Sequence, residues 1–146
     1  MDRSHDVETD AERARLRRLI AGASDAQLAS AMHAGWTIAG VLAHVAYWDA
    51  FAIYWLDKWA VTGEPSAAEA DDSDAANEAA KPLCLALPPR LAAELSLRIA
   101  EEADGKIRAL SDAMLAKIQA KGPPFNLSRA IHRKEHLDEI EAALRR

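Results

Sequence analysis

Residues 36–59 read WTIAGVLAHVAYWDAFAIYWLDKW, and this stretch decides the fold. Its apolar residues recur every three or four positions, which is the spacing of one face of an α-helix. The stripe consists of Ile38, Val41, Val45, Trp48, Ala52, Trp55 and Trp59. Thr37 precedes the stripe, and its hydroxyl can accept a backbone N–H as an N-cap. The pattern therefore predicts one long helix that includes residues 36–59 and ends at Gly63-Glu64-Pro65, with His44 at the edge of its apolar face.

The composition of the chain fits a single all-α domain that covers residues 1–146. Half of the residues are hydrophobic, and there are only six glycines and six prolines, a mixture that favours helices. The long apolar stretch contains Asp49, Asp57 and Lys58 and is apolar on one face only, so we do not expect it to span a membrane. The net charge is −5 without a basic stripe, which argues against nucleic acid as a partner.

Cysteine usage and the N-terminus indicate the cellular compartment. The single cysteine, Cys84, excludes an intramolecular disulfide and is typical of a reducing compartment. Leucines flank it on both sides, and such a cysteine is more often a small buried hydrophobic residue than a nucleophile. The N-terminus is rich in charged residues and does not have the form of a signal peptide. We therefore expect a cytoplasmic protein.

Apolar periodicity and helix-breaking residues predict three further long helices. They cover approximately residues 9–21, residues 90–120 and the segment from residue 126 to the C-terminus. We expect residues 1–6 to lack regular structure, the helix at 90–120 to be interrupted at Gly105 or at Ser111–Asp112, and Asn126 to cap the last helix. Four helices of these lengths form a four-helix bundle.

The connection between the second and third helices is long. Residues 66–81 are rich in Ala, Asp, Glu and Ser, and we expect an exposed crossover with a short helix at residues 75–80. Asp71, Asp72 and Asp74 form an acidic cluster within it. The cluster lacks the glycine and the distal glutamate of a calcium loop, so we interpret it as a solvated linker.

Three histidines are candidates for a metal site. His132 and His136 are four residues apart, so their side chains lie one above the other on the fourth helix. His44 lies on the inward face of the second helix. Three imidazoles can hold zinc or nickel and leave coordination positions open for water or substrate. In the alternative reading, His44 is a core histidine bonded to a carbonyl and the other two are surface residues; the spacing leaves both readings open.

The remaining polar residues near these histidines are less informative. His5 and His33 have no comparable context. Glu139 is the carboxylate nearest to the face of the histidine pair. We interpret it as part of a solvated face; the alternatives are a hydrogen-bond acceptor for a ligand and a general base.

The residues around the candidate site resemble the DinB-like superfamily. Residues 35–48 fit the pattern G-W-T-x-x-x-x-L-x-H-x-x-x-W, and H-R-K-E-H-L-D-E-I follows at residues 132–140. The superfamily includes the DNA-damage-inducible DinB proteins of bacilli, the mycothiol-dependent maleylpyruvate isomerases and the bacillithiol transferases. The resemblance implies a bundle with up-down-down-up connectivity and a zinc or nickel ion on His44, His132 and His136. It also implies a bacterial homodimer.

The resemblance and the candidate site together predict a metal-dependent enzyme. Such an enzyme activates a low-molecular-weight thiol, as in the mycothiol and bacillithiol transferases, or activates water for hydrolysis. Its partners are a small thiol or an electrophilic substrate. The alternative is a non-catalytic bundle that the metal stabilises and that acts as a binding or stress-response module. An enzyme keeps an open coordination position, whereas a structural site is closed by a fourth protein ligand.

Overall fold

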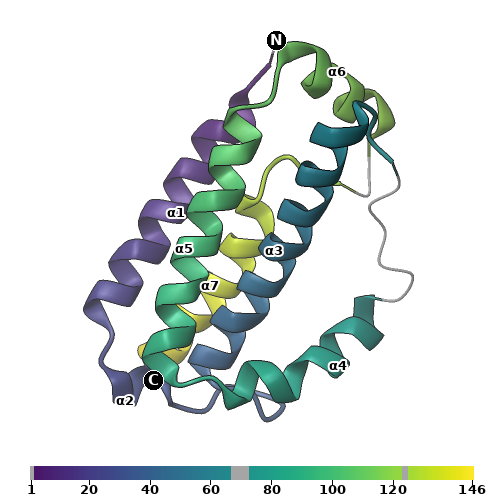
Figure 1. Ribbon diagram of the computed structural model, residues 1–146. Coiled ribbons are helices and arrows are strands. Elements are labelled where there is room, and N and C mark those ends of the chain that lie inside the picture. The colour runs from purple at the N-terminus through teal and green to yellow at the C-terminus, as the bar shows by residue number, and fades with distance from the viewer. Residues whose placement is uncertain (1, 67–72, 123–124) are drawn as a thin grey trace.

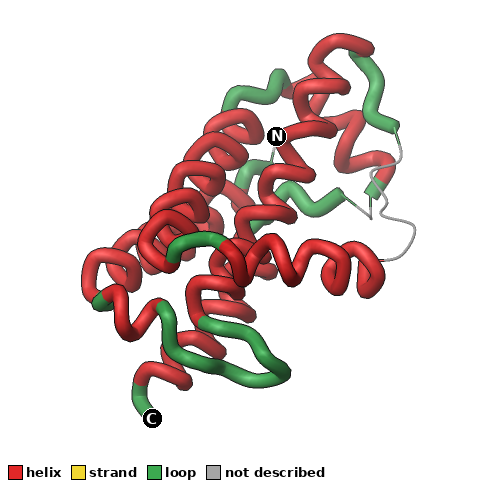
Figure 2. Tube along the Cα trace, turned by 60° about the horizontal axis from the view of Figure 1, so that its bottom comes forward, coloured by secondary structure: helices red, strands yellow, loops and turns green. Residues whose placement is uncertain are grey.

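The computed structural model describes residues 2–66, 73–122 and 125–146, and in these residues the chain forms seven helices and no strand (Figure 2). The helices are α1 (Ser4–Gly22), α2 (Asp25–Leu28), α3 (Ile38–Thr62), α4 (Ser73–Ala86), α5 (Pro89–Arg108), α6 (Asp112–Lys121) and α7 (Ala130–Leu144). The extended pairing in this part of the chain is a single isolated bridge between Ala31 and Thr37. The predicted all-α class is confirmed.

The four long helices α1, α3, α5 and α7 form the bundle (Figure 1). α1 leads away from the N-terminus, α3 and α5 both run in the opposite direction, and α7 runs parallel to α1. α3 packs against α5 and α7, and α1 packs against the same two helices. The connectivity is therefore up-down-down-up. The parallel helices α3 and α5 are joined by the expected long crossover, which contains α4.

α3 follows the sequence pattern at both ends. Thr37 is its N-cap, and its Oγ1 accepts a hydrogen bond from the backbone N–H of Gly40 at 3.0 Å. Gly63 ends the helix with a φ of 75°, a left-handed conformation that glycine adopts without steric cost, and its N–H donates to the carbonyl of Trp59.

None of the helices in the described residues has the length and apolar character needed to cross a bilayer.

Two expected helix boundaries differ from the structure. α1 begins at Ser4, whose N–H donates to Asp2 Oδ1 at 2.9 Å, so the expectation that residues 1–6 lack regular structure is wrong for residues 4–6. The helix expected at 90–120 is divided into α5 and α6. The division is at Ser111, whose hydroxyl accepts the N–H of Met114 as the N-cap of α6, whereas Gly105 lies inside α5 without interrupting it.

The crossover and the last helix also differ from their expected bounds. The short helix expected at 75–80 extends over the whole of α4 and continues through Pro82, although proline lacks the N–H of a regular helix position. Asn126 does not cap α7, which begins four residues later. Instead, the carbonyl of Asn126 accepts a hydrogen bond from Arg129 Nη1 at 3.4 Å.

The apolar core consists of two clusters along the bundle. The larger one includes Leu16, Ile20, Leu28, Ile38, Leu42, Leu137 and Ile140, and the smaller one includes Leu56, Trp59, Ile107 and Ile118. Trp59 is 2% exposed, whereas Trp48 and Trp55 are partly buried. Fully burying a side chain of this size contributes about 1.5–3 kcal/mol, so the apolar stripe of α3 supplies much of the cohesion of the bundle.

A group of buried charges joins the four long helices between these clusters. The guanidinium of Arg133 in α7 donates to Asp49 of α3 at 3.0 Å and to Asp104 of α5 at 2.7 Å. Asp104 also accepts from Arg13 of α1, and Asp49 accepts from Arg129. Burial alone lowers the pKa of Arg133, but the hydrogen bonds and charges of Asp104 and Asp49 outweigh it, so the net pKa is raised. The guanidinium of Arg133 therefore remains charged in the interior.

Replacing Arg133 with methionine should destabilise the protein by about 3–5 kcal/mol, because two buried carboxylates lose their shared partner. The side chain of Arg133 is 1% exposed. Arg17→Met is the matched control, since Arg17 pairs with Glu101 at the surface, where an ion pair contributes about 0–1 kcal/mol. Urea unfolding followed by circular dichroism measures both values. Equal losses in the two variants would show that the buried charges do not hold the bundle together.

Candidate metal centre

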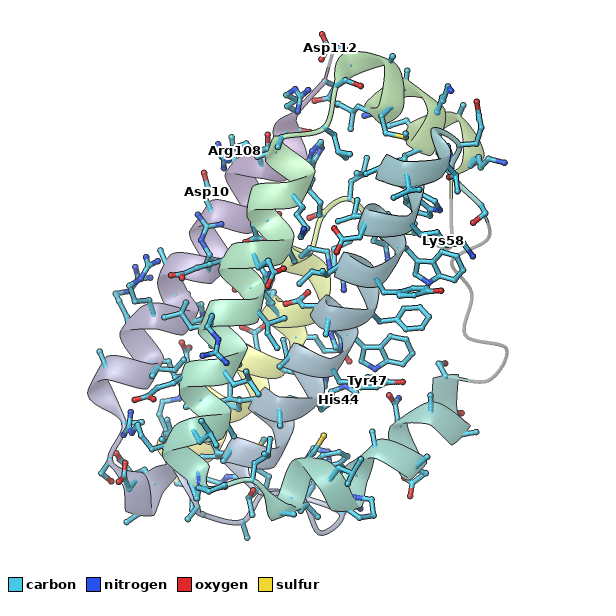
Figure 3. The ribbon with its side chains drawn as sticks, in the orientation of Figure 1. Asp10, His44, Tyr47, Lys58, Arg108 and Asp112 are labelled. Carbon is cyan, nitrogen blue, oxygen red and sulfur yellow. The ribbon has the colours of Figure 1, made fainter. Side chains whose placement is uncertain are left out.

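The structure brings the three candidate histidines together between α3 and α7. His44 Nε2 lies 3.2 Å from His132 Nε2, which lies 3.0 Å from His136 Nε2. One ligand atom from each residue falls within 4.8 Å of the others. The cluster forms because His132 and His136 are one helical turn apart and α3 presents His44 to the same face of α7. Figure 3 shows His44 on the part of α3 that lies next to α4.

The spacing of the nitrogen atoms fits one divalent ion. Ligands at about 2.0–2.1 Å from a tetrahedral ion are about 3.3 Å apart. This separation is close to the distances of 3.2 and 3.0 Å from Nε2 of His132 to Nε2 of His44 and of His136. Each imidazole offers a lone pair, and the cluster contains three such donors. A donor set of three imidazoles is suited to zinc or nickel.

Glu139 fixes the tautomer of one candidate ligand. Its Oε2 lies 3.3 Å from Nδ1 of His136. A carboxylate only accepts hydrogen bonds, so Nδ1 carries the proton and Nε2 of a neutral ring presents its lone pair to the cluster. Of the interpretations of Glu139 from the sequence, the structure supports the hydrogen-bond acceptor rather than the solvated face that we favoured.

The environment keeps two of the histidines neutral. Burial lowers the pKa of His44 to about 4, with a further contribution from His136 and an opposing one from Glu139. Burial lowers the pKa of His132 to about 3, and the neighbouring histidines and the cations Arg129 and Arg133 act in the same direction. Neutral imidazole is the form that binds a metal ion, so both rings are ready to bind one near neutral pH.

Two pockets open onto the histidine cluster. The smaller, of about 270 Å³, is lined by His33, Trp36, Val41, His44, Asp74, Asn77, Glu78, His136 and Glu139. The larger, of about 440 Å³, is lined by His44, Trp48, Ser73, Asn77, Asn126, Arg129, His132, Glu135 and His136. α4 thus lies over the candidate site and contributes to both pockets. The cluster is accessible to small molecules.

Several of these lining residues were not expected from the sequence. His33 has no helical periodicity to place it, yet it lines the smaller pocket with His44. Asp74 belongs to the acidic segment that we interpreted as a solvated linker, and it lines the same pocket; Asp71 and Asp72 lie outside the described residues. His5 is in α1, where its Nε2 lies 3.5 Å from Asp6. The single cysteine, Cys84, is buried as expected, and burial raises the pKa of its thiol.

Comparison with known proteins agrees with the fold and the cluster. The family model of the DinB superfamily matches residues 8–133. The chain belongs to the DinB superfamily. The match includes His44 and His132 and ends one turn before His136, so the third member of the cluster rests on the geometry. No curated protein and no solved structure matches the chain significantly. The helical bundle and the three-histidine cluster are those of a DinB-like metal-binding protein.

Single changes of His44, His132 or His136 to alanine should each sharply reduce the metal content of the purified protein. Each change removes one of the three donors. Removing a residue that only hydrogen-bonds a metal ligand lowers metal affinity by about 10–100-fold, so removing a ligand itself should lower it by at least as much. Glu139→Gln tests that smaller effect, and His5→Ala is the control outside the cluster. Elemental analysis and zinc titration measure the result. Full metal occupancy in His44→Ala would refute the site.

The metal-free protein should become less stable as the pH falls from about 7 to 5. The ordinary histidine pKa is 6.5, so in this range the unfolded chain binds protons at His44 and His132 that the folded chain does not bind. Stability therefore rises with pH across this window. Urea midpoints of chelator-treated protein should show this slope, and the double variant His44→Asn/His132→Asn should show a smaller one. An unchanged slope in the double variant would contradict the lowered pKa values.

Proposed function

We propose that this protein is a metal-dependent enzyme that transfers a low-molecular-weight thiol to an electrophilic substrate. The observation that carries the proposal is that two pockets open onto the cluster of His44, His132 and His136. A structural zinc site is closed by four protein ligands. The described residues provide a cluster of three, which leaves room for an exogenous ligand.

The three histidines would hold a zinc or nickel ion through Nε2. When bound, the ion supplies the positive charge that lowers the pKa of a thiol or water in its open position. Glu139 holds His136 in the tautomer that binds the ion. Burial keeps His44 and His132 unprotonated. The aromatic rings of Trp36 and Trp48 line the pockets and provide apolar surface for the rest of a substrate.

The transfer converts a thiol and an electrophile into a thioether. The thiol loses its proton, its sulfur forms a bond to the electrophilic carbon, and the leaving group departs with the electron pair of its former bond and takes up a proton. The sulfur comes from the small thiol and not from Cys84. That side chain is 7% exposed, burial disfavours its thiolate form, and it lines neither pocket.

A steady-state assay tests this function. Protein loaded with zinc or nickel should accelerate the reaction between a small thiol and a chromogenic aryl halide, and His132→Ala should lose the acceleration together with the metal. Lys134→Ala, on the exposed face of α7, is the control. If loading raises the melting temperature but no thiol reacts faster than in buffer, the ion only joins α3 to α7. The protein is then the non-catalytic module.

A further inference from the structure

The two pockets over the histidine cluster meet at one side chain of α4. Both are lined by His44, His136 and Asn77. Among the described residues, Asn77 is thus the only one outside the histidine cluster that belongs to both pockets. Its side chain borders both a compartment of about 270 Å³ and one of about 440 Å³.

The position of Asn77 is fixed from α3. The indole Nε1 of Trp48 donates to Asn77 Oδ1 at 2.7 Å, which is a short hydrogen bond. The indole is itself held edge-on between Tyr47 and Phe51, with ring centroids 5.2 and 5.3 Å away. One turn further along α4, Lys81 Nζ donates to the carbonyl of Ala34 at 2.6 Å. These contacts hold α4 against the bundle and orient the amide.

The same hydrogen bond determines which atoms of Asn77 remain for a ligand. Because Trp48 Nε1 is only a donor, it must bind the carbonyl oxygen of the amide, which assigns the other position to Nδ2. No residue in the described part of the chain accepts a hydrogen bond from Nδ2. With respect to the described residues, the two N–H donors of this partly buried amide are therefore left for a molecule in the pockets.

The two compartments also differ in charge. Asp74, Glu78 and Glu139 line the smaller one, whereas the larger one contains Arg129 together with Glu135. Arg129 is held by Asp49, whose Oδ1 accepts a hydrogen bond from its Nε at 2.9 Å, so the guanidinium on that side is paired with a buried carboxylate. A reaction of two substrates needs two adjacent places with different surfaces, and the two pockets that share Asn77 provide them.

We propose that Asn77 is a positioning and specificity residue of the candidate metal centre. Its side chain limits the size of each compartment, and its Nδ2 donors hydrogen-bond the small thiol that reaches the histidine cluster. This inference rests on the proposed thiol-transfer function and deepens it by assigning the residue that selects the thiol.

Cobalt-loaded protein provides a readout that does not depend on turnover. Cobalt(II) takes the place of zinc in sites of this kind, and a thiolate bound to it gives a near-ultraviolet charge-transfer absorption. Titration with 2-mercaptoethanol, mercaptoacetate and the bulkier 2-naphthalenethiol then gives a dissociation constant for each. The variants are Asn77→Ala, which removes both the bulk and the donors, and Asn77→Asp, which keeps the shape but replaces the donors with an acceptor.

Both variants should bind 2-mercaptoethanol about tenfold more weakly, which corresponds to about 1.4 kcal/mol, close to the net contribution of one hydrogen bond. Asn77→Asp should weaken mercaptoacetate further through charge repulsion. Only Asn77→Ala should bind 2-naphthalenethiol more tightly, because only this variant joins the two compartments. Leu83→Ala, on the exposed face of α4, is the control and should match the wild type.

Cobalt stoichiometry and circular dichroism establish that each variant is folded and loaded, and the isosteric Asn77→Asp provides the test if Asn77→Ala does not fold. Constants within twofold of the wild type for all three thiols in the folded variants would overturn the role of Asn77 alone. If the wild type itself shows no thiolate absorption with bound cobalt, the proposed thiol-transfer function fails, and the role of Asn77 fails with it.

Discussion

The buried guanidinium of Arg133 is the contact on which the rest of the bundle depends. It is held between Asp49 of α3 and Asp104 of α5, and Arg13 and Arg129 bind the outer sides of the same carboxylates. Apolar association is non-directional, whereas buried charges must meet at hydrogen-bonding distance. These paired charges therefore fix the positions of the four long helices relative to one another along the bundle axis. Because Arg133 follows His132 directly, it also fixes the turn of α7 that carries the histidine.

The buried charges and the histidine cluster depend on each other electrostatically. Burial is the main cause that lowers the pKa of His132, and the charges of Arg129 and Arg133 act in the same direction. An isolated pair of cations would repel a metal ion, but Asp49 and Asp104 neutralise them at close range. The result is a position where imidazoles stay unprotonated while the long-range repulsion is small. A bundle with an entirely apolar centre would also keep the imidazoles unprotonated, but it would not hold the turn of α7 that carries His132 in place.

Local signals predicted the helices well, and long-range contacts account for the differences. The N-cap of Thr37 and the stop at Gly63 both lie next to the segment they limit, so the bounds of α3 were predicted to within three residues. The start of α7 could not be predicted in this way. Asn126 has the right side chain for a cap, but the chain before α7 is instead held by Arg129, whose partner Asp49 is 80 residues away in sequence. Nothing local to residues 126–129 indicates that partner.

In the candidate site, too, some residues were predicted from local sequence signals and others were not. The structure brings together the cluster that was predicted from the spacing of His132 and His136 and from the inward position of His44. Asn77 of the crossover and His33 of a loop also reach the site, and no periodic pattern in the sequence indicated this.

The buried charges did leave a signal in the sequence. Asp49, Asp104 and Arg133 each occupy a position on an otherwise apolar helix face, between buried residues one turn away on either side. A charge at such a position requires an opposite charge from a facing helix, since an unpaired buried charge costs several kcal/mol. Two acids and one base on three different helices can satisfy that requirement only by meeting at one level of the bundle, which is where the structure places them.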